Sequence, residues 1–155
     1  MIYFAYGSNM DTAQMRARCA GARVRGIGFL ADHRLAFPRW SNIRAHAVAS
    51  VEACAGAEVW GVLFDMTADD WANLSRREGY VAPGHPQNGY DLRAVDISTP
   101  AEVVAAHTYV ANVNPRRPEP GLTSAHYLNQ IINGAIEHGL PADYLALLRA
   151  VPTRD

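Results

Sequence analysis

Residues 2–11 read IYFAYGSNMD, and this stretch decides how the fold begins. Residues 2–5 are apolar and aromatic, which is typical of a short buried strand. Residues 6–10 then predict a turn, and Asp11 is a suitable N-cap for a helix over residues 12–19. A strand that leads through a turn into a helix start presents consecutive backbone N–H groups near a helix dipole. From these residues alone two interpretations stay open: a cradle for an anion or oxyanion, and a plain strand-to-helix turn.

The hydrophobic pattern of the remaining chain predicts more strands than helices. Strands are expected at residues 22–36, 46–52, 58–65, 89–98 and 102–111, and helices between Thr67 and Gly79, over 125–138 and from Pro141 onward. Strands in runs with few helices between them favour an α+β fold or a small barrel over a doubly wound sheet. The chain has 155 residues and shows neither repeats nor a long linker, so we expect one domain over residues 1–155.

Composition argues against several classes of function. The net charge is −1, and all 14 basic residues are arginine, so neither a nucleic-acid binder with a basic face nor a lysine-dependent site is expected. The six histidines and two cysteines show no metal-ligand spacing, so we expect no metal. Cys19 and Cys54 are expected to be buried thiols, with a single disulfide between them as the alternative. Neither a signal peptide nor a membrane-length apolar run is present, which predicts a cytoplasmic protein without membrane contact.

Glu78 is the strongest candidate for acid/base chemistry. In the helix predicted before Gly79, Trp71, Leu74 and Glu78 fall near one face. A carboxylate at a helix C-terminus is disfavoured by the helix dipole by about 0.3–1 kcal/mol, which hints at a function. The alternative is a solvated helix-end carboxylate. Ser8 is a weaker candidate as a nucleophile, because it lacks the G-x-S-x-G elbow and no histidine is placed near it.

Two tyrosines, Tyr90 and Tyr109, fall in predicted strands. Half-buried strand tyrosines are mostly packing residues, although hydroxyls that line a barrel could also hold a substrate.

Several blocks of the sequence, in the right order along nearly the whole chain, resemble the gamma-glutamylcyclotransferase superfamily, including its AIG2-like members. They are the YGSN signature at residues 6–9, residues 58–64, REGY at 77–80, Thr108 and Tyr109, SAHYL at 124–128 and GLPADY at 139–144. The resemblance implies a small mixed β-barrel with flanking helices and an active site at the loop after the first strand.

The resemblance also implies roles for individual residues. Glu78 would be the catalytic acid/base, and the substrate would be held by Tyr6, Gly7, Ser8, Asn9, Tyr90 and Tyr109. The implied reaction is attack of the α-amine of a γ-glutamyl amide on its own γ-carbonyl, which releases 5-oxoproline and an amine or amino acid without a cofactor or metal. Related alternatives are γ-glutamylamines or γ-glutamylated natural products as substrates, and a non-catalytic barrel that binds a small molecule. The leaving group and the oligomeric state are not readable from the sequence.

Overall fold

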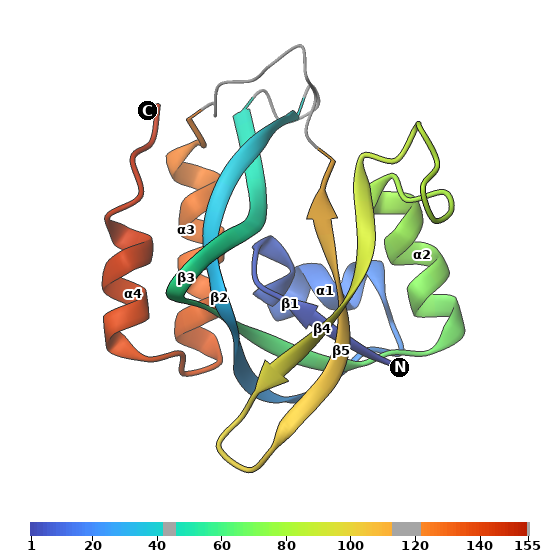
Figure 1. Ribbon diagram of the computed structural model, residues 1–155, viewed down its shortest axis with the longest axis horizontal. Helices are drawn as coiled ribbons and strands as arrows, with labels where there is room; N and C mark the ends of the chain where they lie inside the picture. The colour runs from blue at the N-terminus through green and yellow to red at the C-terminus, as the bar shows by residue number, and fades with distance from the viewer. Residues whose placement is uncertain (42–45, 113–121, 155) are drawn as a thin grey trace.

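The computed structural model describes residues 1–41, 46–112 and 122–154. Its elements are β1 (Ile2–Ala5), the 3₁₀ helix η1 (Ser8–Met10), α1 (Thr12–Arg18), β2 (Arg23–Ser41), β3 (His46–Asp65), α2 (Ala68–Glu78), β4 (Tyr90–Ser98), β5 (Val103–Ala111), α3 (Ala125–Glu137) and α4 (Ala142–Arg149). The strands form a closed barrel in the order β1-β3-β2-β4-β5, with α3 and α4 on one side and α2 on the other (Figure 1).

Strand β1 makes the barrel a mixed one. It runs antiparallel to β3, where Tyr3 pairs with Phe64, and parallel to β5, where Tyr3 pairs with His107. The remaining neighbours are antiparallel, including the contact of β2 with β4. The expected α+β fold with a small mixed barrel and flanking helices is therefore confirmed.

The two strands expected at residues 46–52 and 58–65 are one long strand, β3. The pairing of β2 with β3 shifts between these segments, where Ala31 faces Glu58 but His33 faces Ala53. Asp32 has a φ of 57° here, and its carboxylate accepts a hydrogen bond of 2.9 Å from the backbone N–H of Gly56. The sequence break at this point is thus an irregularity within one strand, of the kind that bends a sheet, and not a turn between two strands.

Helix α2 begins and ends where the sequence predicts. The Thr67 hydroxyl accepts from the backbone N–H of Asp70, and the Asp70 carboxylate accepts from that of Thr67, which forms a capping box. Gly79 ends the helix with a φ of 69°, a left-handed conformation that favours glycine. These two signals set the register of the helix and place Glu78 at its last residue.

The barrel interior and the helix faces share one core. Its fully buried large side chains include Phe4, Phe64, Met10, Leu63, Leu74, Ile97 and Ile131. Helix α3 contributes the stripe that its sequence predicts, with Tyr127, Ile131 and Ala135 buried. The core therefore connects β1 and η1 to helices on both sides.

Helix α3 packs closely against the segment that follows β1. A β-carbon built on Gly134 would lie 2.8 Å from the backbone carbon of Met10 and 2.8 Å from the backbone nitrogen of Asp11. Because real β-carbons essentially never approach backbone this closely, only glycine allows this packing. Helix α3 therefore fixes the position of the loop after β1.

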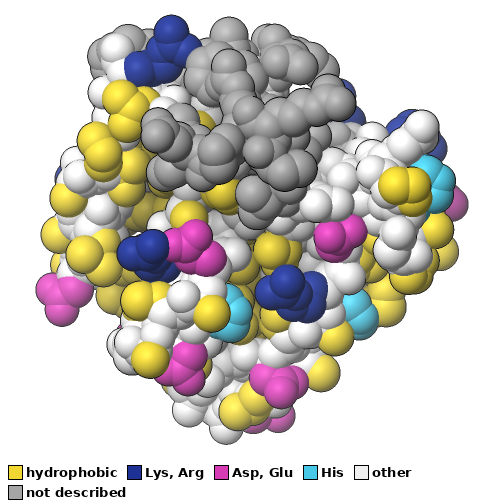
Figure 2. Space-filling view, turned by 45° about the horizontal axis from the view of Figure 1, so that its top comes forward, with side chains coloured by type: hydrophobic (Ala, Val, Ile, Leu, Met, Phe, Trp, Pro, Cys, Tyr) yellow, Lys and Arg dark blue, Asp and Glu magenta, His cyan; other side chains and the backbone are white. Residues whose placement is uncertain are grey.

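Basic, acidic and hydrophobic side chains are interspersed on the face shown in Figure 2. None of the described helices is long and apolar enough to cross a membrane.

Candidate active site

The loop after β1 and the last turn of α2 meet through Asn9 and Glu78. The side-chain amide nitrogen of Asn9 donates to Oε1 of Glu78 over 3.3 Å and to the hydroxyl oxygen of Tyr3 over 3.0 Å. Asn9 is buried and Glu78 is half-buried. The structure therefore brings together two residues that are 69 positions apart and that the sequence analysis singled out independently.

Helix α1 holds the other side of the Asn9 amide. Nη1 of Arg18 donates to the amide oxygen of Asn9 over 2.7 Å, and Nε2 of Gln14 donates to the same oxygen over 3.1 Å. Both donors come from one face of α1, four residues apart. The amide oxygen thus faces α1 while the amide nitrogen faces Glu78.

Ser8 is placed as a structural residue. Its buried hydroxyl accepts a hydrogen bond of 2.9 Å from Nε2 of Gln14. A carboxamide is not a base, and no other side-chain partner of Ser8 is found among the described residues. The arrangement gives no means of activating Ser8 as a nucleophile.

The charge of Glu78 acts on two buried tyrosine hydroxyl groups, those of Tyr3 and Tyr109. Burial, reinforced by the charge of Glu78, holds the pKa of Tyr3 well above its usual range. Burial and the same charge also raise the pKa of Tyr109, although its hydrogen bond of 2.7 Å with Ser75 opposes the shift. Both phenols therefore stay neutral at physiological pH.

Two further tyrosines direct their hydroxyl groups at the backbone. Tyr6 donates to the carbonyl oxygen of Tyr109, and Tyr90 donates to that of Ala49 over 2.8 Å. The hydroxyl of Tyr127 accepts from the N–H of Ala49 over 3.1 Å. These contacts tie the strands around the loop together, so Tyr6 and Tyr90 have a positioning role whatever else they contact.

The loop also presents backbone N–H groups. Those of Met10 and Asp11 donate to Gly7 and Ser8, whereas within the described part of the chain those of Gly7, Ser8 and Asn9 have no hydrogen-bond acceptor. Unpaired N–H groups beside a half-buried carboxylate are suited to bind a negatively charged oxygen. These N–H groups are available for the cradle, which stays a prediction beside the plain turn.

The described residues contain no group of three or more His, Cys, Asp or Glu side chains that could hold a metal ion. Cys19 is buried, and its thiol donates to the backbone oxygen of Asp70 over 3.4 Å. Burial raises the pKa of this thiol to about 11, which makes it a poor nucleophile.

Sequence reasoning missed four residues of this site: Tyr3, Gln14, Arg18 and Ser75. The signal for Ser75 was available, because it precedes Glu78 by three residues and so lies on the same helix face. Gln14 and Arg18 likewise share a face of α1, but no pattern in the sequence directs that face at Asn9.

This fold and site define a small mixed-barrel protein with a half-buried carboxylate beside the loop that follows its first strand. The model of the AIG2-like family matches residues 58–148, more than half of the chain. The chain belongs to the AIG2-like family.

Relatives of known name match over nearly the full chain. Gamma-glutamylcyclotransferase of Homo sapiens is 29% identical over 160 residues, which cover 99% of this chain and 80% of the relative. The Mus musculus protein of the same name is 29% identical over 156 residues, 97% of this chain and 78% of the relative. A solved structure titled gamma-glutamyl cyclotransferase superimposes with a TM-score of 0.89 at 27% identity, covering 100% of this chain and 89% of the other. The family resemblance seen in the sequence is thus confirmed.

Proposed function

We propose that this protein is a cyclotransferase that releases 5-oxoproline from γ-glutamyl amides, with Glu78 as its acid/base. The observation that carries the proposal is the hydrogen bond from Asn9 to the half-buried Glu78 carboxylate beside unpaired loop N–H groups. The relatives named gamma-glutamylcyclotransferase, similar over nearly the whole chain, support the reaction type.

In this mechanism Glu78 accepts a proton from the α-ammonium group of the substrate. The free amine then attacks the γ-carbonyl carbon within the same molecule, and the oxyanion that forms is stabilised by the backbone N–H groups of Gly7, Ser8 and Asn9. Glu78 returns the proton to the leaving nitrogen as its bond to the γ-carbon breaks, and then accepts the second proton of the attacking nitrogen, which departs with the amine as it becomes an ammonium group. The products are 5-oxoproline and a free amine or amino acid.

Holding the substrate's α-amine close to its γ-carbonyl carbon supplies much of the rate enhancement. A well-oriented intramolecular attack has an effective molarity of about 10⁵–10⁸ M, far above the concentration of water. Buried hydroxyl groups such as Tyr3 and Tyr109 would hold the glutamyl part in this bent shape, and Tyr90 is a further candidate for substrate contact. We place the protein in the cytoplasm, where soluble γ-glutamyl compounds are its substrates.

The test is a panel of γ-glutamyl dipeptides, a γ-glutamyl tripeptide and γ-glutamylamines, assayed for release of 5-oxoproline. Turnover of at least one class is expected, and the preferred leaving group distinguishes amino-acid from amine substrates. Saturable binding without turnover of any member would instead identify a non-catalytic binding barrel.

A second measurement separates cyclisation from hydrolysis. Turnover in ¹⁸O-water should give unlabelled 5-oxoproline, because cyclisation keeps the substrate's own carbonyl oxygen. ¹⁸O-labelled glutamate as the main product would show that the site works as an amidohydrolase.

A further inference from the structure

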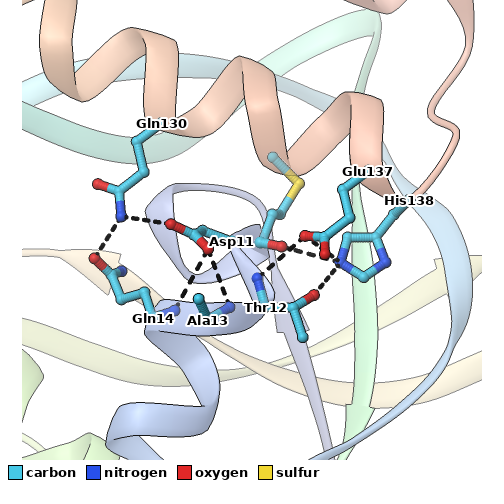
Figure 3. A network of polar contacts seen from close by, with 8 residues as sticks. Asp11, Thr12, Ala13, Gln14, Gln130, Glu137 and His138 are labelled. Atoms are coloured by element: carbon cyan, nitrogen blue, oxygen red, sulfur yellow. Dashed lines mark hydrogen bonds and ion pairs between the residues drawn. The ribbon is translucent and has the colours of Figure 1, made fainter.

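Three side-chain amides form a continuous series of hydrogen bonds from α3 to the active site. Nε2 of Gln130 donates to Oδ2 of Asp11 over 3.0 Å and to Oε1 of Gln14 over 2.7 Å, as Figure 3 shows. Nε2 of Gln14 donates onward to Ser8 and to Asn9, and Nδ2 of Asn9 donates to Tyr3 and Glu78. Each of the three amide nitrogens therefore donates two hydrogen bonds, one of them to the next residue on the path from Gln130 to Glu78.

The residues at the two ends of this series of hydrogen bonds determine which way each amide is oriented. An ionised carboxylate only accepts hydrogen bonds, so Asp11 at one end and Glu78 at the other each require an amide nitrogen. A guanidinium only donates, so Arg18 requires the oxygen of Asn9. If any one amide were turned over, it would place like atoms against each other in at least two of its contacts.

Asp11, which accepts a hydrogen bond from Gln130 at the end away from Glu78, is itself held in place. Asp11 is the N-cap of α1, and its Oδ1 accepts from the backbone N–H groups of Ala13 and Gln14, which leaves Oδ2 for Gln130 (Figure 3). The close packing at Gly134 keeps α3 against this segment. Asp11 and the packing of α3 thus hold Gln130 without any contact to Asn9 or Glu78.

We propose that Gln130, on α3, is a positioning residue for catalysis. By orienting Gln14, it keeps the amide nitrogen of Asn9 turned towards Glu78 and Tyr3. This inference rests on the proposed function of Glu78. Gln130 does not touch the reacting groups and acts through Gln14.

A change in the orientation of the Asn9 amide would alter the hydrogen bond that it donates to the carboxylate of Glu78. Arg18 bonds the same amide as Glu78, and the ionisable groups whose pKa the charge of Glu78 raises are Tyr3, Tyr6, Tyr109 and Cys19. These four neighbours stay neutral near pH 7. The hydrogen bond that Asn9 donates favours the ionised form of Glu78, so its loss is expected to move the acidic limb of the activity profile to higher pH.

The test substitutes Gln130→Glu, which keeps the shape of the side chain but removes its two N–H donors. Asn129→Asp is the matched control, because it makes the same chemical change at the neighbouring exposed position of α3. We expect kcat to fall about tenfold in Gln130→Glu, the order of one lost net hydrogen bond, with little change in KM. We also expect its acidic limb to move to higher pH, and Asn129→Asp to match the wild type. Gln130→Leu, which adds no charge, should show the same effects in weaker form.

A double-substitution cycle tests whether Gln130 acts through Gln14. If Gln130 acts through Gln14, then Gln130→Glu should have no added effect on kcat in a Gln14→Leu background. Additive losses would overturn the proposal, because they would mean that Gln130 acts through general stability.

A measurement without substrate keeps this inference separate from the proposed function. In ¹⁵N-labelled protein, the side-chain NH₂ signals of Asn9 should shift as Glu78 titrates, and this shift should disappear in Glu78→Gln. Gln130→Glu should also displace the Asn9 signals, whereas Asn129→Asp should not. Asn9 signals that are the same in Gln130→Glu, Asn129→Asp and the wild type would overturn the proposal, whether or not the protein turns over γ-glutamyl amides.

Discussion

The amide nitrogen of Asn9 lies 3.3 Å from Oε1 of Glu78, and this contact joins the loop after β1 to the end of α2. Each partner is placed by a different part of the fold: Asn9 by hydrogen bonds from α1, and Glu78 by the capping box and the terminal glycine of α2. The catalytic account depends on both supports, and each can be altered separately.

Replacement of Gly134 tests how firmly α3 positions the loop. In a helix, Gly→Ala normally stabilises by about 0.5–1 kcal/mol. In Gly134→Ala, however, the new β-carbon would lie 2.8 Å from the backbone of Met10 and Asp11, so we expect a net loss of about 1–3 kcal/mol. Urea unfolding measures this change, with the exposed Asn133→Ala as control. A Gly134→Ala protein as stable as the wild type would show that the loop is free to move away from α3.

Substitutions in the loop should separate backbone from side-chain roles. A β-carbon on Gly7 would sit 3.5 Å from the β-carbon of Ala49 and 3.7 Å from the Tyr127 hydroxyl, so the two further methyl groups of Gly7→Val would have to displace these neighbours. Ser8→Ala removes one hydroxyl that only accepts from Gln14. We expect Gly7→Val to lower kcat/KM much more than Ser8→Ala. The reverse order in steady-state kinetics would reopen a role for Ser8 as a nucleophile.

Stability should fall at alkaline pH, partly through Cys19. Burial raises the pKa of this thiol from 9.0 to about 11, so the folded state keeps its proton at a pH where the unfolded chain loses it. The stabilisation is complete below about pH 9 and is lost as the pH rises towards 11; two pKa units correspond to about 3 kcal/mol at most. Urea unfolding at pH 8 and pH 10.5 should show a smaller alkaline loss in Cys19→Ala than in the wild type. An identical loss in the two proteins would mean that the thiol does not contribute.

The sequence predicted the helices and strands better than the contacts between them. The caps of α2 are local signals and correctly predicted Glu78 at a helix end, whereas the order of strands and helices favoured an α+β fold or a small barrel and the resemblance implied the barrel itself. The break within β3 was misread because an irregularity and a turn both use glycine and small residues near Gly56. The bonds from α1 to Asn9 and from Ser75 to Tyr109 depend on how helices sit on the barrel, which no local pattern encodes. The contacts of Gln14, Arg18 and Gln130 therefore emerged only from the three-dimensional structure.

The most direct test of the account is the rate of 5-oxoproline release by Glu78→Gln. The change keeps the shape of the side chain and removes the base, so turnover should fall at least ~10²-fold while the thermal unfolding temperature stays close to that of the wild type. Asp69→Asn makes the same chemical change at an exposed position in the first turn of α2 and should retain nearly full turnover. A folded Glu78→Gln protein that releases 5-oxoproline at a rate near that of the wild type would contradict the assignment of Glu78 as the acid/base.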